Sequence, residues 1–380
     1  MTMKTIYDLR VVTPLHIGNG EQLQPLEFIY TKGWVHVLDE EKFLAYLDTV
    51  KATDDFLAWL AGSDRRRGIS AFVRRCSKVK ERDIISNCVA YRVATASEPR
   101  NVRKFIKTYD HRPYIPGSSI KGALRNAILY CILKDAEGVS GMREYVDTAL
   151  KKLQAQKQSG KRIGRKQERE FGKKLEYQYL RGFQFGPQST DDDAHSDIFS
   201  CIEVSDSSPL ESDSLEIRQI SVLGSSRSIP IWAEVLRQNV TTRFYLTIDE
   251  ERLEAARRYT GQKERSVVDL VIKYVSDPIA AMRAFAQDCF AYEKETVKNL
   301  NAGKGTRIDP FSRMASSPGF RIGWGGGLIG STVSLLLDEE ARGRMLGFFK
   351  PASRPRAPKT RKIVEGLNLE LGWASVKKVD

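Results

Sequence analysis

The chain has 380 residues, 41% of them hydrophobic, which is enough for a large core in one elaborated domain or two. Lys and Arg number 61 against 48 Asp and Glu, so the net charge is +13 at pH 7. This excess favours a nucleic-acid partner. A membrane partner is disfavoured, because no stretch approaches the roughly 20 apolar residues of a membrane span. The first residues read as a strand and not as a signal peptide, so we expect a cytoplasmic protein.

Period-two and β-branched runs predict strands at 4–13, 26–30, 34–38, 88–95, 197–206, 215–223, 229–236, 242–248 and 367–376. Helical spacing of apolar residues predicts helices at 39–48, 53–61, 118–134 and 263–300, the last interrupted near Pro278. The segment between Gly138 and Leu180 is polar, basic and helical in pattern, which is typical of an insertion. Strands and helices that mix in this order predict an α+β fold with insertions.

Neither a metal nor a cofactor is expected. The five cysteines form no C-x-x-C pair and have no metal-like spacing with the four histidines, so we interpret them as reduced core thiols. Gly325, Gly327 and Gly330 match the dinucleotide fingerprint G-x-G-x-x-G, but the chain then enters a Pro-rich basic run where that fold needs another strand. Glycines 325 to 327 would instead let a polymer backbone approach the main chain, or form a tight structural turn.

The start of the helix within 112-RPYIPGSSIKGALRNAIL-129 carries an unexpected charge. The pattern predicts Ser118 or Ser119 as N-cap, and a capping box from Ser118 would place Glu or Gln at position 121. The sequence has Lys121 there, and Arg125 follows one turn later. A bound phosphate would explain cations beside the positive end of a helix dipole. The structural alternatives are an exposed Lys121 and an ion pair of Arg125 on the helix surface.

Four segments together resemble a known family: 13-TPLHIGNGE-21, 114-YIPGSSIKGALR-125, 320-FRIGWGGGLIG-330 and 358-PKTRKIVEGLNLELGW-373. They resemble the RAMP proteins of CRISPR defence, and their order most resembles the fifth-subunit family of the type III-A Csm complex. The resemblance implies an RRM-like, ferredoxin-type RAMP core at 1–135 and 198–380, with a thumb-like β-hairpin at about 214–237. Residues 136–197, which the resemblance does not cover, would form a basic helical insertion.

The resemblance implies a non-catalytic crRNA-binding subunit that caps the backbone filament at the crRNA 3′ end and supports crRNA maturation and antiviral defence. The implied partners are the crRNA and paired target RNA, the backbone and small subunits of the Csm complex, and host nucleases that trim the crRNA 3′ end. The residues expected to contact RNA are His16, Gly18, Asn19, Gly20, Gly117, Ser118, Ser119, Lys121, Arg125, Arg218, Arg227, Arg321, Gly323, Gly325, Gly326 and Gly327.

No nuclease centre is expected. The resemblance associates target cleavage in the backbone subunits with an Asp after the first strand, and the matching stretch 18-GNGEQLQPLEF-28 contains none. His16 beside this stretch could act as a general base without a metal. That possibility leaves one alternative open, a metal-independent crRNA-processing endoribonuclease of the same superfamily.

Overall fold

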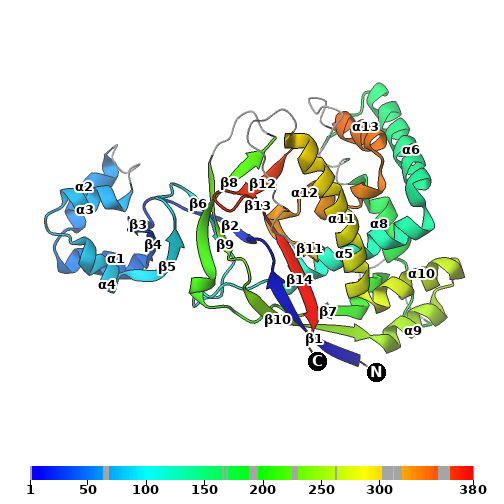
Figure 1. Ribbon diagram of the computed structural model, residues 1–380, viewed down its shortest axis with the longest axis horizontal. Coiled ribbons are helices and arrows are strands. Elements are labelled where there is room, and N and C mark those ends of the chain that lie inside the picture. Colours follow the sequence, from blue (N-terminus) through cyan, green and yellow to red (C-terminus); the bar gives the residue numbers. More distant parts are fainter. Residues whose placement is uncertain are drawn as a thin grey trace.

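Two sheets and a set of helices form the part of the protein that the structure describes (Figure 1). The computed structural model describes residues 2–62, 68–164, 167, 170–187, 196–224, 230–261, 263–301, 311, 319–349 and 360–379. Its strands are β1 (Thr2–Val11), β2 (Gly18–Leu23), β3 (Phe28–Thr31), β4 (Trp34–Leu38), β5 (Val89–Thr95), β6 (Val102–Phe105), β7 (Ile202–Val204), β8 (Leu215–Leu223), β9 (Ile231–Leu236), β10 (Thr241–Asp249), β11 (Phe320–Arg321), β12 (Arg361–Val364), β13 (Leu369–Glu370) and β14 (Trp373–Lys378). Its α-helices are α1 (Glu40–Thr49), α2 (Thr53–Ala61), α3 (Ile69–Arg75), α4 (Glu81–Asn87), α5 (Gly117–Ala136), α6 (Gly138–Gln158), α8 (Lys173–Leu180), α9 (Glu250–Tyr259), α10 (Arg265–Ser276), α11 (Pro278–Asn301), α12 (Gly327–Gly330) and α13 (Glu339–Phe349).

The central sheet has the strand order β11-β14-β1-β10-β7, with every neighbouring pair antiparallel. In chain order, β1 is followed by α5, β7, β10, the helices α9 to α11, and β14. This is the βαββαβ order of a ferredoxin-type unit, in which the first strand lies between the fourth and the third. Buried residues of β1 and β10 share the main core with residues of α5 and α11. The predicted α+β fold with an RRM-like core is confirmed.

The second sheet has the order β2-β6-β9-β8-β5-β4-β3, and β12 joins it on β8. Strands β8 and β9 form the predicted thumb-like hairpin, paired from Leu215 opposite Leu236 to Ile220 opposite Ile231. The hairpin's tip, at 225–229, lies outside the described residues, and Arg227 lies in it. The described part of the hairpin is its two strands, and the prediction for Arg227 stays untested.

Helices α1 to α4 form a lobe that Figure 1 shows apart from the rest of the molecule, next to β3, β4 and β5. The lobe has a hydrophobic cluster of its own, with Phe43, Phe56, Trp59 and Phe72 at its centre. The sequence predicts its first two helices and its β3–β4 hairpin. A separate core was not predicted, because helical spacing indicates which residues are buried but not which helices pack together.

The segment expected as a basic helical insertion contains α6 and α8, which contact α5. Val146 of α6 and Leu175 of α8 are buried in the same cluster as the central sheet. The division into core and insertion therefore stays a prediction, since these helices share the core. Within the described ranges, no helix is long and apolar enough to cross a membrane, and no group of His, Cys, Asp and Glu could hold a metal ion. All five cysteines are free thiols.

The strand predicted at 197–206 is only partly correct. Residues Ile198–Cys201 form a 3-10 helix, and the strand is limited to Ile202–Val204. Asp197 explains the difference, because its carboxylate accepts a hydrogen bond from the backbone N–H of Phe199 at 2.9 Å and so caps the 3-10 turn.

Candidate nucleic-acid interface

Helix α5 begins at Gly117, and its N-cap is Pro116, which offers no side-chain cap. The prediction of a serine N-cap is therefore wrong. The backbone N–H of Gly117 instead donates to the Asp206 carboxylate at 2.7 Å, so a distant segment supplies the anion that this helix end favours. A Cβ on Gly117 would collide with the Val204 carbonyl, so this glycine permits close packing of the chain against β7. Ser118 is exposed and lies in the first turn.

The two cations expected to bind phosphate at this helix both have partners within the protein. The Lys121 ammonium donates to the Ile202 carbonyl at 2.6 Å, and burial lowers the pKa of Lys121. Arg125 pairs through Nε with Glu176 at 2.6 Å and through Nη2 with Asp197 at 2.9 Å. Arg125 therefore forms ion pairs within the protein, which was the structural alternative for this residue. RNA contact by Lys121 and Arg125 stays a prediction.

The glycine-rich loop between β11 and α12 packs against the protein's own main chain. A Cβ on Gly323, whose φ is +69°, would collide with the His16 carbonyl, and a Cβ on Gly325 would collide with the Leu371 carbonyl. Both glycines therefore permit close packing of the main chain, which fits the structural turn given as the alternative for Gly325. RNA contact by these glycines stays a prediction. Gly327 differs, because a Cβ there would meet nothing within 4 Å.

Arg321 belongs to a buried ion-pair network. Its side chain is 3% exposed and pairs with Glu293 at 2.9 Å and Glu370 at 3.0 Å. Arg361 of β12 binds the second oxygen of Glu293, so the network joins α11, β11, β12 and β13. Burial raises the pKa of Glu370 to about 7. Arg321 was expected to contact RNA, but its surroundings give it a role in the fold.

His16 is also enclosed, at 3% exposure. Its Nδ1 lies 2.7 Å from the Glu234 carbonyl oxygen, and its ring makes T-shaped contacts with the rings of Phe105 and Trp324. Burial lowers the pKa of His16, so the imidazole is neutral near pH 7. Gly18, next along the chain, opens β2 and is exposed.

The first residues of β2 form an exposed turn-like start to the strand. Asn19 accepts a hydrogen bond through Oδ1 from the Glu21 N–H at 2.9 Å, and Gly20 has a φ of +92°. Gly18, Asn19 and Gly20 are all solvent-accessible, so the structure leaves them free to meet a ligand.

A buried carboxylate lies beneath this loop. Glu234 of β9 is fully buried and accepts hydrogen bonds from the Phe105 N–H at 2.6 Å, from the Tyr91 hydroxyl at 3.1 Å, and from the Lys107 ammonium. The ladder between β6 and β9 covers only Val102 and Arg103. Beyond its end, the Glu234 carboxylate binds the Phe105 N–H in place of a backbone partner. Glu234 thereby fixes β6 and the residues after β1 relative to the hairpin.

Near Glu234 and its partners lie three residues that the sequence did not single out. We call them the Trp324 face: Arg103 of β6, Trp324 of the glycine-rich loop and Lys362 of β12. The Arg103 guanidinium carbon lies 4.3 Å from the Trp324 ring centroid, and the Lys362 ammonium lies 5.0 Å from it. The backbone N–H of Trp324 donates to the His16 carbonyl at 2.9 Å, which fixes the loop. The indole packs against the apolar cluster that includes Ile220 of the hairpin.

The charge of the Trp324 face is not neutralised. In the part of the chain that the structure describes, neither Arg103 nor Lys362 has a side-chain hydrogen bond or ion pair, in contrast to Arg125. Burial lowers the pKa of Lys362, and the nearby cations Arg321 and Arg103 lower it further. Two unpaired cations beside a half-buried aromatic ring suit a phosphate chain with a stacked base.

Arg218 lies close to this face but is already paired. It is opposite Ala233 of β9, which is also opposite Arg103 of β6, so the three side chains share one side of the sheet. Its Nη2 lies 2.8 Å from the Glu216 carboxylate, and its side chain is 26% exposed. Contact of Arg218 with RNA stays a prediction.

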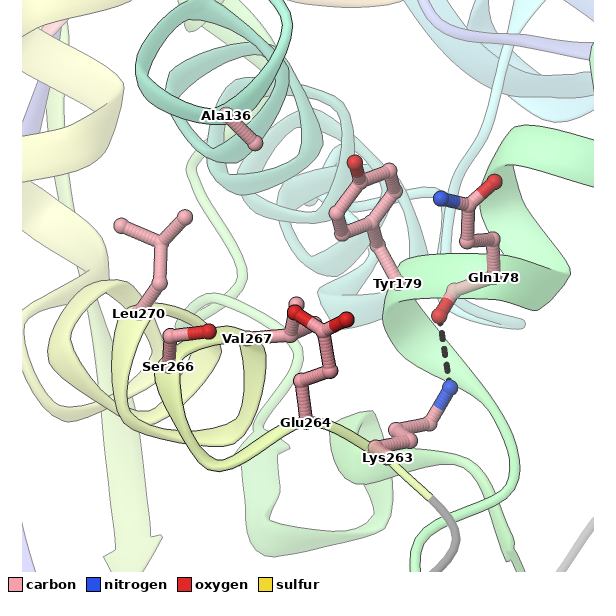
Figure 2. A pocket seen from close by; sticks show the side chains of 8 residues that line it. All are labelled: Ala136, Gln178, Tyr179, Lys263, Glu264, Ser266, Val267 and Leu270. Carbon is pink, nitrogen blue, oxygen red and sulfur yellow. Dashed lines mark hydrogen bonds between the residues drawn. The ribbon is translucent and has the colours of Figure 1, made fainter.

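A pocket of about 550 Å³ lies between the end of α5, α8 and the start of α10 (Figure 2). Figure 2 shows Tyr179 and Leu270 facing it, with the Lys263 ammonium donating to the Gln178 carbonyl at 2.6 Å. Because its lysine binds the protein's own main chain, this pocket fits an anionic ligand less well than the Trp324 face.

Most of the chain matches one protein-family model. Residues 8–300 match the model of the RAMP superfamily, which is most of the chain, so the protein belongs to this superfamily. The sequence-based resemblance is thereby confirmed. Among relatives, the chain is 28% identical over 123 residues to the "CRISPR system Cms protein Csm5" of Methanocaldococcus jannaschii. This match covers 32% of the chain and 29% of that relative.

Two solved structures resemble the whole fold. One is a chain of a Csm–crRNA–target RNA ternary complex of a type III-A CRISPR–Cas system, with a TM-score of 0.65 and 24% identity, covering 99% of this chain and 100% of that one. The other is T. onnurineus Csm5, with a TM-score of 0.68 and 22% identity, covering 97% and 99%. At these identities the likeness establishes a common fold.

Proposed function

We propose that this protein is a non-catalytic crRNA-binding subunit of a type III-A CRISPR interference complex. It caps the backbone filament at the crRNA 3′ end and supports crRNA maturation and antiviral defence. Membership in the RAMP superfamily, the Csm5 relative and the fold shared with a chain of a Csm–crRNA complex support this function. Its partners are the crRNA with its paired target RNA, the backbone and small subunits, and host nucleases that trim the crRNA.

The Trp324 face is the observation that carries the proposal. Arg103 and Lys362 each neutralise a phosphate, and the Trp324 ring offers an aromatic surface to a base or ribose between them. The exposed start of β2 follows the same side, since Gln22 is opposite Arg103. Phosphate contacts position the guide without reading its sequence, as a subunit that accepts many different guides requires.

The endoribonuclease alternative finds no support at His16. The Nδ1 atom lies 2.7 Å from the Glu234 carbonyl oxygen, and only 3% of the residue is exposed. A general base must reach the proton that it abstracts, and this side chain is buried. His16 therefore holds Trp324 in place through its backbone carbonyl and its ring. RNA cleavage belongs to other subunits of the complex.

A salt titration of RNA binding tests the proposal. The probe is a single-stranded RNA carrying a spacer and its flanking repeat, bound to the full chain. Single-stranded RNA gives a salt slope of about 0.7 per neutralised phosphate, so Arg103→Ala with Lys362→Ala reduces the slope by about 1.4 and weakens binding for all spacers alike. Lys151→Ala with Lys152→Ala, two exposed residues of α6, is the control with the same change in charge.

The slope of the control should match the wild type. An equal loss in both double variants would mean that only net charge matters, and would remove the Trp324 face as the guide site. Trp324→Phe should retain most of the affinity while Trp324→Ala loses it, because stacking needs the ring and not the indole N–H.

A further inference from the structure

The central sheet has a face that other elements leave open. Along β1 and β10 the burial alternates, and the outward residues of both strands are solvent-accessible. Ile6 and Tyr245 lie directly opposite one another in the middle of this face, with 36% and 41% of their surface exposed. These two side chains give the centre of the face a small exposed apolar area.

Cations surround this exposed pair. The Lys4 ammonium lies 4.0 Å from the Tyr245 ring centroid. Arg10 and Lys377 are exposed on the same face, one on β1 and the other on β14. Arg10 donates to the Asn239 amide oxygen at 2.7 Å, which leaves its charge uncompensated.

The acids on the face are fewer than the cations. Asp8 pairs with Arg243 at 2.8 Å, which removes both charges from the balance. Glu203 of β7 and Asp249 at the end of β10 then remain against Lys4, Arg10 and Lys377. The Asp249 carboxylate is engaged as the N-cap of α9. The remaining outward residues include Thr241, Thr247 and Ser375, whose hydroxyls can donate to phosphate or ribose oxygens.

This composition fits RNA better than a protein partner. The core of a protein interface is depleted of charge and is apolar over a wide area, and here two large apolar side chains stand among cations and hydroxyls. An aromatic ring on a flat sheet with flanking cations is instead the pattern of sheets that stack bases of single-stranded RNA.

We propose that the open face of the central sheet, consisting of Lys4, Ile6, Arg10, Tyr245 and Lys377, is a second binding surface for single-stranded RNA. A base stacks on Tyr245 over Ile6, and the cations take the phosphates on either side. Lys4 and Arg10 are ~20 Å apart along β1, which is long enough to follow several nucleotides. The surface uses no residue of the Trp324 face, so it does not depend on the proposed guide site.

The test measures binding of a fluorescein-labelled oligouridylate of about ten nucleotides to the full chain. It is run both in the wild type and in the Arg103→Ala/Lys362→Ala variant, which removes the two cations of the Trp324 face. In that variant background, Tyr245→Ala should weaken binding by about 5- to 150-fold, the effect of losing one stacked base. Tyr245→Phe should bind as Tyr245 does, because it keeps the ring.

The matched control is Tyr177→Ala on α8, which removes a tyrosine of similar exposure, 46%, from another part of the molecule. Its affinity should equal that of the parent. A thermal melt accompanies each variant. If Tyr245→Ala does not fold, Lys4→Ala with Arg10→Ala replaces it, with an expected reduction of about 1.4 in the salt slope.

Two outcomes would overturn the proposal. One is unchanged affinity in the variant with Tyr245→Ala, or an unchanged salt slope without Lys4 and Arg10. The other is retained RNA binding together with loss of a partner subunit from the assembled complex, which would make the face a protein interface. Failure of the Arg103 and Lys362 substitutions to affect guide binding would reject the proposed function and leave this surface standing.

Discussion

Two basic sites in this protein differ in whether their cations are already paired. At the start of α5, Lys121 and Arg125 bind protein oxygens, and Arg125 has two carboxylate partners. On the Trp324 face, Arg103 and Lys362 flank an aromatic ring and, among the described residues, have no acid bound to their side chains. A cation near a glycine-rich or helix-start motif is therefore no guide to phosphate binding until its partners are known. The partners come from segments far away in the chain.

The contrast is sharpest in two consecutive residues of β12. Arg361 points inward to Glu293, with 4% of its side chain exposed, whereas Lys362 points outward to Trp324. Successive side chains of a strand alternate between its faces, so one face holds the fold and the other remains available for a ligand.

The largest expected effect is the difference in free energy of unfolding between variants of Arg361 and Lys362. Arg361→Ala removes one partner from a buried network and should lower the free energy of unfolding by about 3–5 kcal/mol. Lys362→Ala should change it by no more than about 0.5 kcal/mol, because its charge is unpaired. Urea denaturation of the two variants measures the difference. Equal changes in both variants would show that Lys362 contributes to the fold as much as Arg361 does.

A smaller effect is expected at the start of α5. Arg125→Ala leaves Glu176 and Asp197 without their cation. It should lower the free energy of unfolding by about 1.5 kcal/mol, the low end of the range for bonds to charged groups, because the pairs are partly exposed. The salt slope of RNA binding should remain that of the wild type. The helix dipole alone predicts the reverse, a neutral or stabilising substitution with a reduced slope. Denaturation and a salt titration of the same variant distinguish the two.

The smallest effect is a pH dependence. Burial and neighbouring cations lower the pKa of Lys362 in the free protein, and a bound phosphate would raise it again. Affinity should therefore be constant below the free-state pKa, and should fall as pH rises from that value to the higher pKa of the complex, by at most about tenfold per pH unit. Lys362→Arg should remove this loss, which separates it from titration of the RNA bases. A parallel decline in both proteins would assign it to the RNA.

Local patterns predicted much of the fold. The β3–β4 hairpin, helices α1 and α2, the thumb-like hairpin and the break between α10 and α11 at Pro278 all follow from spacing and turn residues within a short window. Strand β6 was not predicted, since its four residues VRKF give too short a pattern to separate from a loop. The N-cap of α5 was assigned incorrectly because Asp206, which binds the Gly117 N–H, lies outside any local window.

The site was harder to predict, for the same reason. Arg103, Trp324 and Lys362 come from three segments that only the assembled sheets bring together. The sequence contained a signal for two of them, a tryptophan inside 323-GWGGG-327 and a basic run ending at Lys362. Without the pairing of β6 with β9 and of β12 with β8, that signal could not be joined to Arg103.

The placement of β1 between β10 and β14 has a consequence for synthesis on the ribosome. Strand β1 ends at Val11, but its neighbour β14 begins only at Trp373. At translation rates of about 5–20 residues per second, β1 waits roughly 20–70 s before both of its edges can be paired. The lobe of α1 to α4, whose contacts are local, can fold during that interval. The central sheet is thus the last part of the molecule to close, and the nascent chain carries an unpaired strand edge until then.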